Sequence, residues 1–349
     1  MKICLMMIVK NEESTITRCL TSINQWISEY IIIDTGSTDQ TKDKIAEVMA
    51  GIPGSIIDQR WVNFGYNRSE LVSLIPDTCD YALLLDADMT VEVNSELLGE
   101  IPDSDVMMLK VASSHEYRMP YLIKRGPAYR FVGSTHEYLD ADRNLSRATF
   151  DGFTIHHHAD GGSRSDKFER DEKLLRMDLI SDPNNSRVHF YLGQTLRDLG
   201  KVQESIKHYQ KSKELSGWIE ERYISALETG KLYSALGDTP AALNQYLHAI
   251  ELNPSRAEAY YYSGKLFNSI KYYRLAALVL SVAIDWKPST DILFVERWIE
   301  NWGLRLEYGV ALWWSGNRGK AKEIFEELLN VVDLPQNILD TVHRNLALC

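Results

Sequence analysis

Two carboxylates one residue apart, Asp86 and Asp88, follow the short apolar run 81–85. The run is too short for a helix and is bounded by polar residues, so it predicts a buried strand. Two acids at the end of such a strand would be costly to bury without compensation. Mg²⁺ or Mn²⁺ would compensate them, because these cations bind carboxylate oxygens and keep places for water and phosphate oxygens. The alternative is an Asp-rich turn or helix start.

The bulk composition narrows the class of protein. The chain has 349 residues, a formal net charge of −11, 44% hydrophobic residues and four cysteines. This length allows two globular domains. The acidic balance argues against nonspecific nucleic-acid binding, which needs a basic face. The cysteines form no Cys-x-x-Cys pair, which indicates reduced thiols and a cytoplasmic location, and the short apolar stretch before Lys10 predicts neither a signal peptide nor a transmembrane segment.

Apolar runs and helical spacings alternate in the first half of the chain. Strands are expected at 3–9, 30–33, 81–85 and 106–109, and helices around 16–23 and 41–49. This alternation predicts right-handed crossovers and a mainly parallel sheet, which binds ligands at the carboxyl ends of its strands. Polar loops with acidic residues follow the strands at 10–12, 34–39 and 86–88. We therefore expect these loops to lie together at one edge of the sheet.

The second half contains an internal repeat of small and large residues. A glycine recurs at 193, 230, 264 and 309, and sixteen residues after each stands a large residue, namely Tyr209, Tyr246, Leu280 and Phe325. The glycines would let paired helices approach closely, and the large residues would fill the grooves beside them. Spacings of 37, 34 and 45 residues are close to the ~34 residues of tetratricopeptide repeats, which the stretch 186–346 resembles. Such repeats bind peptides or mediate self-association; the alternative is a stack that only caps the first domain.

The first half resembles the family-2 glycosyltransferases of GT-A fold. The segments that carry the resemblance are Lys10-Asn11-Glu12, the contiguous run 34–39, the run 63–68 and Asp86-Ala87-Asp88. A subset of this family carries tetratricopeptide repeats behind the transferase domain. The resemblance thus implies an α/β domain followed by an all-α domain: a Rossmann-like GT-A domain at 1–165 and a helical repeat domain at 166–349.

The resemblance also implies roles for single residues. Asp34 would accept hydrogen bonds from the base or ribose of a nucleotide, Glu12 would line the other side of the base, and Arg68 would pair with a phosphate. Taken singly, Gly36 and Ser37 could equally form an ordinary turn, and Arg68 could be a surface helix residue. The expected nucleotide-sugar-binding set is Val9, Asn11, Glu12, Asp34, Thr35, Gly36, Ser37, Asp39, Arg68, Asp86, Ala87, Lys167 and Arg170.

Three consecutive histidines, His156 to His158, follow Phe153-Thr154-Ile155. If 153–158 is a strand, then Phe153, Ile155 and His157 share the core face, and Thr154, His156 and His158 share the other. His158 is then best placed to reach a metal, His156 is the second choice, and His157 is a structural histidine. With the acids, the expected metal ligands are Asp88, His158, Asp86 and His156; Asp86 could instead face the ribose or a metal-bound water.

The expected reaction is sugar transfer from a nucleotide diphosphate, with uridine as the family default and Mn²⁺ or Mg²⁺ as cofactor. One base suffices for inversion, and Glu137 is the first candidate, with His136 second; alternatively Glu137 pairs with an arginine such as Arg130. Lys167 and Arg170 could hold the diphosphate or form a solvated helix face. The acceptor could be a peptide, protein or glycan, and a homodimer could form through the repeats.

Two other classes of function compete with this one. Nucleotidyl transfer would need a glycine- and lysine-rich loop after the first strand, which Lys10 to Glu13 does not provide. A non-catalytic scaffold with a decayed transferase domain would have no reason to keep Asp34, Arg68, Asp86 and Asp88.

Overall fold

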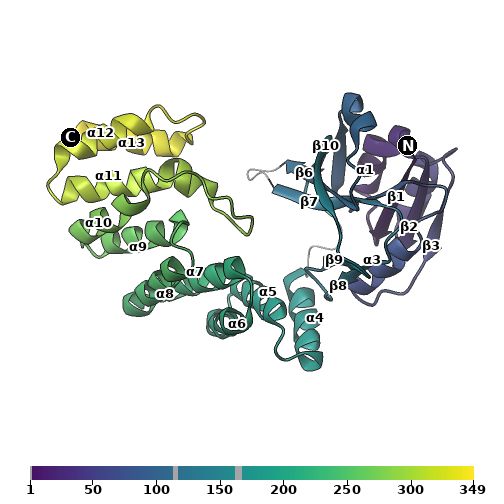
Figure 1. Cartoon of the computed structure of the whole chain (residues 1–349), viewed down its shortest axis with the longest axis horizontal. Coiled ribbons are helices and arrows are strands. Elements are labelled where there is room, and N and C mark those ends of the chain that lie inside the picture. The colour runs from purple at the N-terminus through teal and green to yellow at the C-terminus, as the bar shows by residue number, and fades with distance from the viewer. Residues whose placement is uncertain (1, 113–116, 162–166) are drawn as a thin grey trace. The chain divides into compact units, whose positions relative to one another are not determined.

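The structure, a computed structural model, describes residues 2–112, 117–161 and 167–349. The chain divides into two compact units, Met1–Asp178 and Leu179–Cys349 (Figure 1). The division lies inside helix α4 (Lys167–Ser181), whereas the expected boundary at 165/166 falls at residues 162–166, which lie outside the described residues. None of the helices in the described ranges is long and apolar enough to cross a membrane.

The first unit is built on a sheet with the strand order β3-β2-β1-β4-β7-β6-β10-β5, beside the hairpin β8-β9. The strands are β1 Ile3–Val9, β2 Glu29–Asp34, β3 Gly54–Asp58, β4 Tyr81–Leu84, β5 Met89–Val93, β6 Val106–Ala112, β7 Tyr117–Lys124, β8 Tyr129–Val132, β9 Tyr138–Ala141 and β10 Arg147–His157. Within the run β3-β2-β1-β4 each pair of adjacent strands is parallel, and so is the pair β6 and β10. The sheet is mixed, because β7 is antiparallel to both β4 and β6, and β5 to β10, but four of its seven pairings are parallel, in line with the expected mainly parallel sheet.

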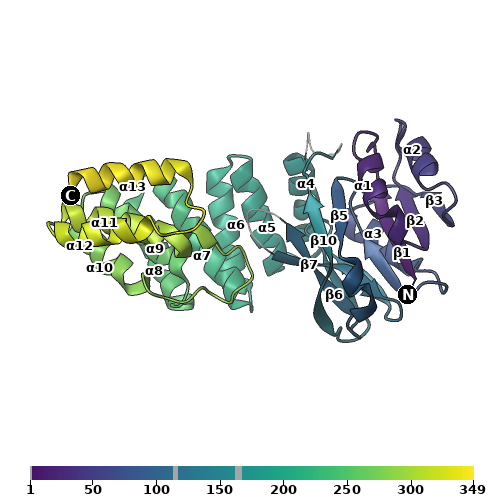
Figure 2. The ribbon, with the colours of Figure 1, turned by 90° about the horizontal axis from the view of Figure 1, so that it is seen from above.

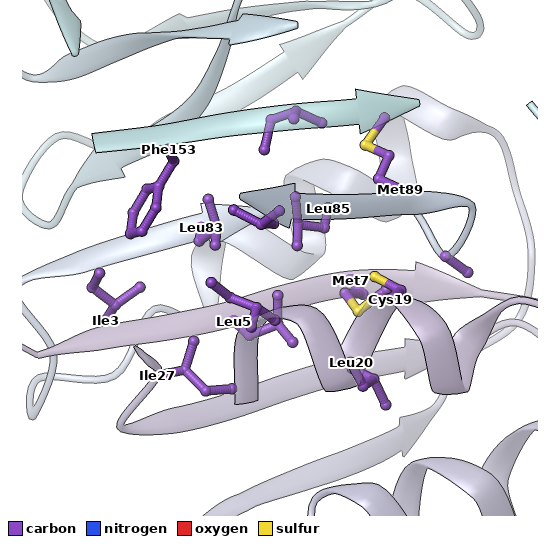
Figure 3. Close-up of a cluster of buried hydrophobic side chains, with 14 of the residues drawn as sticks. Ile3, Leu5, Met7, Cys19, Leu20, Ile27, Leu83, Leu85, Met89 and Phe153 are labelled. Carbon is purple, nitrogen blue, oxygen red and sulfur yellow. The ribbon is translucent and has the colours of Figure 1, made fainter. Parts of the chain in front are cut away.

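Strand β1 lies at the centre of this unit and is buried on both faces. Its odd-numbered residues, including Leu5 and Met7, pack against Cys19 and Leu20 of helix α1 (Ile16–Ile23) (Figure 3). Its even-numbered residues Cys4 and Met6 join a second cluster with helix α3 (Phe64–Ser73). A strand covered on both sides reads as a continuous apolar run, which is why the sequence identifies it. The other helical segments of this part are α2 (Thr41–Val48) and the 3₁₀ turns η1 (Asn24–Trp26) and η2 (Ser95–Glu100).

The carboxyl ends of β1, β2 and β4 meet at one edge of the sheet. Val9 is in register with Asp34, and Met6 with Leu84. The loops that follow these strands therefore start side by side, as the sequence predicts. The Asn11 N–H donates to Ser37 Oγ at 2.9 Å, and the Thr38 N–H donates to Asn11 Oδ1 at 2.8 Å, so the first two loops are bound to each other.

The second unit is a succession of paired helices (Figure 2). They are α5 Ser186–Asp198, α6 Val202–Leu215, α7 Ile219–Ala235, α8 Thr239–Leu252, α9 Ala257–Ser269, α10 Tyr273–Ala283, α11 Leu304–Trp314, α12 Arg318–Leu328 and α13 Gln336–Leu348, with a π-helical turn, η3, at Ile299–Gly303. Helices α5 and α6, α7 and α8, α9 and α10, and α11 and α12 pack as pairs.

The repeat register found in the sequence is the packing register of these pairs. A Cβ on the repeated glycine would meet the large side chain sixteen residues later in every pair: Gly193 meets Tyr209 at 3.0 Å, Gly230 meets Tyr246 at 2.5 Å, Gly264 meets Leu280 at 2.3 Å and Gly309 meets Phe325 at 2.5 Å. The predicted close approach of the paired helices is thereby confirmed.

The turns inside the pairs have left-handed backbone. Gly200, Gly237 and Gly316 have φ of +73°, +78° and +95°, and Lys271, at the equivalent place, has φ of +65°. Glycine reaches this region without the steric cost that other residues meet. The third pair is therefore joined by a more strained turn than the others.

We predict that Gly230→Ala lowers the free energy of unfolding by about 1–3 kcal/mol, since its Cβ would overlap the fully buried ring of Tyr246. The matched control is Gly319→Ala in the first turn of α12, where a Cβ meets nothing within 4 Å. Chemical denaturation followed by circular dichroism measures both variants. Equal stability of the two would contradict the packing described.

Candidate functional site

Asp34 ends β2 with its side chain almost fully buried. Its Oδ1 accepts hydrogen bonds from the N–H groups of Gly36 and Ser37 at 2.8 and 2.7 Å. Gly36 has φ of +105°, which only glycine adopts readily, so the turn can close around the carboxylate. The other oxygen, Oδ2, is buried and has no hydrogen-bond partner among the described residues. Since buried acceptors are normally paired, this oxygen is suited to receive a donor from a ligand.

The remaining residues of the first two loops hold the loops in place. Thr35 Oγ1 donates to the Val9 carbonyl at 3.1 Å. Asp39 accepts from the Glu13 N–H and from Thr41, and the Glu12 N–H donates to Thr41 Oγ1 at 2.7 Å. Burial opposes ionisation of Asp39, but the hydrogen bonds from Thr41 and from backbone N–H groups outweigh it and lower its pKa. These side chains shape the edge of the sheet through contacts with one another.

Arg68 joins the acids of the third loop to a more distant carboxylate. Its Nη2 donates to Asp86 Oδ1 at 2.7 Å, and its Nε lies 3.0 Å from Glu137 Oε1. The guanidinium also lies over the Phe131 ring, 5.8 Å from its centroid. Burial opposes the charge of Arg68, but Asp86 and Glu137 more than compensate, and the pKa of Arg68 is raised. Glu137 therefore pairs with Arg68; Arg130 instead pairs with Asp140. Arg68 and Asp86 both line a small cavity with the Phe131 ring.

Asp88 lies in a second acidic position on the same edge, with 7% of its surface exposed. A Cβ on Gly161 would stand 3.3 Å from both Asp88 Oδ2 and Glu12 Oε2. The absence of a side chain at Gly161 thus leaves room beside two carboxylates from separate loops. His157 Nε2 lies 3.2 Å from Asp88 Oδ2.

The three histidines face three different partners. The His157 ring lies 3.2 Å from the Asp88 carboxylate, and the His158 main-chain N–H donates to the Asp88 carbonyl at 3.0 Å. His158 Nε2 is hydrogen-bonded to Thr90 Oγ1 at 2.8 Å, and His156 Nε2 lies 3.2 Å from Glu92 Oε2. The expected alternation is correct for Phe153 and Ile155, which are fully buried. Strand β10 ends at His157, so the face that His157 shares with Phe153 and Ile155 lies next to the Asp88 loop at this end of the strand.

The segment 131–137, which we call the Glu137 loop, is held from both sides. On one side the Phe64 N–H donates to the Ser134 carbonyl at 3.0 Å, and Gly65 leaves no room for a Cβ, which would stand 2.1 Å from the Gly133 carbonyl oxygen. On the other side the Ser134 N–H and hydroxyl donate to Asp178 at 3.1 and 2.5 Å.

Helix α4 contributes a second carboxylate to this loop. The Thr135 hydroxyl donates to Asp171 Oδ1 at 3.2 Å. Sequence reasoning missed Asp171 and Asp178, and no pattern in the sequence relates these two acids to residues 134 and 135. His136, the second base candidate, has φ of +50°.

Lys167 and Arg170 start the described part of α4. The Arg170 guanidinium lies over the Phe64 ring at 5.2 Å from its centroid and 3.8 Å from Asp171. Lys167 is exposed, with its Nζ 5.9 Å from the Phe168 centroid. The neighbouring Ser165 and Asp166 lie outside the described residues.

The acids of this edge suit a hard divalent cation that also binds a substrate. Among the residues that the structure describes, no three His, Cys, Asp or Glu side chains gather as a closed metal cage. Mg²⁺ and Mn²⁺ commonly use one or two carboxylates and complete their coordination with water and phosphate oxygens. Asp88, with Asp86 on the same loop and the space beside Gly161, fits this open kind of site.

Comparisons with known proteins agree with this architecture. Residues 4–150 match the family model described as glycosyl transferase family 2, and residues 186–217 and 230–269 match tetratricopeptide repeat models. A TPR repeat-containing protein of Synechococcus elongatus is 25% identical over 72% of this chain and 66% of its own length. The SPbeta prophage-derived glycosyltransferase SunS of Bacillus subtilis is 26% identical over 59% of this chain and 51% of its own.

The crystal structure of MamA is 24% identical, with a TM-score of 0.39, and the match covers 46% of this chain and 86% of that one. The chain spans about half to two thirds of the length of the curated relatives it matches. The first part of the chain is thus similar to glycosyl transferase family 2 and the helical part to tetratricopeptide repeats, in line with the sequence resemblance.

We predict that Asp171→Asn changes how stability depends on pH. Burial raises the pKa of the Asp171 carboxyl. A carboxyl whose pKa is raised on folding contributes stability at low pH, and this contribution is lost as the pH rises through the folded-state pKa. The asparagine keeps an oxygen that can accept from Thr135 but cannot ionise. Thermal unfolding between pH 4 and 7 should therefore show a smaller loss of stability in the variant than in the wild type; identical pH profiles would contradict this.

Proposed function

We propose that this chain, whose first part is similar to glycosyl transferase family 2, is a metal-dependent glycosyltransferase that moves a sugar from a UDP-sugar to an acceptor with inversion. The observation that carries the proposal is the chain of contacts Asp86–Arg68–Glu137 at the ligand-binding edge of the sheet. In it Arg68 would bind the diphosphate and Glu137 would be the base, on the sheet edge that also carries the carboxylate of Asp88.

The nucleotide would bind over the first two loops. Asp34 Oδ2 would accept a hydrogen bond from the base or ribose, which would satisfy this buried oxygen. Glu12 and the backbone from Val9 to Asn11 would line the other side, and Thr35, Gly36, Ser37 and Asp39 would fix the shape of the pocket.

The diphosphate would bind at the third loop. Asp88 would hold Mn²⁺ or Mg²⁺ together with Asp86 or a water that Asp86 orients, and His157 would be the histidine beside it in place of His158 and His156. When bound, such a cation neutralises charge that develops on the leaving diphosphate. Arg68 would turn from Asp86 towards a phosphate oxygen, a role that guanidinium geometry suits. Arg170 and Lys167 lie on the first described turn of α4 and would act as secondary cationic groups.

Glu137 would take the proton from the acceptor hydroxyl or thiol, with His136 as the second candidate. Its carboxylate pairs with Arg68, and release of Arg68 to the donor would free the carboxylate for the acceptor. Inversion needs only one such base. The acceptor would be a peptide, protein or glycan, and the helical repeats would recruit it or bring two copies of the chain together.

A non-catalytic scaffold is the second candidate, and the matches to tetratricopeptide repeats favour it. Such a scaffold would use the helical unit alone. The two functions differ in whether the first unit binds nucleotide-sugar.

We predict that EDTA and Asp88→Ala each abolish release of UDP from a UDP-sugar. EDTA removes the metal ion, and Asp88→Ala removes the carboxylate that would bind it. Glu137→Gln should lower turnover by a factor of about 10²–10⁴, the usual contribution of general base catalysis, while nucleotide binding persists. A coupled UDP-release assay across UDP-sugars measures these rates. The control is Asp77→Asn, which changes an exposed carboxylate that pairs only with Arg125 at the surface. Normal turnover in Asp88→Ala would remove the metal from the mechanism.

We also predict that UDP-sugar with Mn²⁺ stabilises the wild type. A ligand at 100 times its dissociation constant adds about 2.7 kcal/mol to the free energy of unfolding. Differential scanning fluorimetry should therefore show that the ligand raises the melting temperature of the wild type. The rise should be smaller in Asp34→Ala. A scaffold without a working nucleotide site would show no shift with any nucleotide-sugar.

A further inference from the structure

One repeat of the helical unit is longer than the others. Gly264 and Gly309 are 45 residues apart, against 34 for Gly230 and Gly264. The additional length lies between α10 and the π-helical turn η3. Within it, residues 289–296, which we call the inserted segment, have neither helical nor strand structure. The inserted segment contacts helices α5, α7 and α9, each of which is the first helix of a pair.

Side chains of α7 and α9 bind the main chain of the inserted segment. Glu220 Oε2 accepts from the N–H groups of Ile292 and Leu293 at 2.9 and 2.8 Å. Glu258 Oε1 accepts from the Glu296 N–H at 3.1 Å.

Arg256 completes this set of main-chain contacts. It donates from Nη1 to the Leu293 carbonyl at 3.0 Å and from Nη2 to the Phe294 carbonyl at 3.4 Å. Arg256 and Glu258 form a fully buried ion pair at 2.6 Å, so both groups are fixed in position. Side chains of the helical pairs thus bind main-chain groups of residues 292, 293, 294 and 296, which a peptide of the same backbone shape would also present.

Two side chains of the inserted segment fill specific places. The Phe294 ring stacks on Phe190 of α5, with centroids 6.1 Å apart and planes at 11°. The Glu296 carboxylate accepts from Lys231 Nζ at 2.5 Å and from the Tyr262 hydroxyl at 2.8 Å. An aromatic residue two positions before a carboxylate is therefore the side-chain pattern that this face recognises.

The inserted segment is held mainly by polar contacts. Ile292 is 81% exposed and Phe294 is 49% exposed, whereas Leu293 packs against the core cluster of the helical unit. Phe294 also has φ of +46°, a strained conformation for a bulky residue. Polar main-chain contacts thus carry most of the attachment, while strain opposes it.

We propose that the face formed by α5, α7 and α9 is a binding site for a non-helical peptide with the pattern aromatic-x-carboxylate, and that the inserted segment occupies it as an internal competitor. A peptide binds only when the segment has left, so its apparent dissociation constant equals the intrinsic one divided by the open fraction. The inserted segment therefore lowers the apparent affinity of the site for a peptide. Substitutions that weaken the contacts of the segment should raise this affinity. This proposal does not depend on glycosyl transfer.

The test uses a fluorescein-labelled peptide with the sequence of residues 288–297, titrated into the full chain and followed by fluorescence anisotropy. The variants are Phe294→Ala and Glu296→Gln, which loosen the segment and leave every contributing side chain of α5, α7 and α9 in place. Each should bind the peptide several-fold to about tenfold more tightly than the wild type. The control Glu323→Gln, on an exposed position of α12, should bind like the wild type, and a scrambled peptide should not bind.

A second measurement applies to the wild type and needs no variant to fold. Amide hydrogens of 292, 293 and 296 are bonded to Glu220 and Glu258, so they should exchange faster with deuterium when excess peptide displaces the segment. Folded variants that bind no more tightly than the wild type would overturn the proposal. So would unchanged or slower exchange of the segment at high peptide concentration.

Discussion

The guanidinium of Arg68 lies between two carboxylates that are 51 residues apart in the chain, Asp86 and Glu137. Each acid is partly withdrawn from water and would be costly there without a counter-ion, so the three groups depend on one another. Arg68 itself is placed by α3, which Asn63 caps and which the Glu137 loop contacts through Ser134. Arg68 thus links the sheet edge, α3 and the Glu137 loop. A substrate that binds Arg68 would change the contacts of all three.

The fold of the first unit could be predicted where strands are buried on both faces. Strand β1 and the Tyr81 strand have continuous apolar runs, and the predicted bounds of β1 agree with the structure. Strands β5 and β7 are only partly buried, and their weaker patterns are easily missed. Because β7 runs antiparallel between β4 and β6, the sheet is more mixed than the strands found in the sequence indicated. The helical unit was easier, since its glycines and large residues repeat in register with the packing.

The site could be predicted where function follows from position along a strand. The acid-containing loops do share one edge, because parallel register fixes where strands end. The alternation along β10 also placed His157 on the face that carries Phe153 and Ile155. It could not show that the core ends before His157, so that this histidine lies beside Asp88. The contacts of Asp171 and Asp178 with the Glu137 loop arise from tertiary packing of a helix and leave no local pattern.

Helix α4 belongs to both compact units, since its residues up to Asp178 count with the first and the rest with the second. The aspartates that support the Glu137 loop lie beyond the matched family segment, which ends at residue 150. A shortened protein cut at the end of that segment would lose most of β10, with its pairing to β5, and the helix that holds Ser134 and Thr135. The first compact unit extends to Asp178, and trimming by family boundaries would leave the Glu137 loop unsupported.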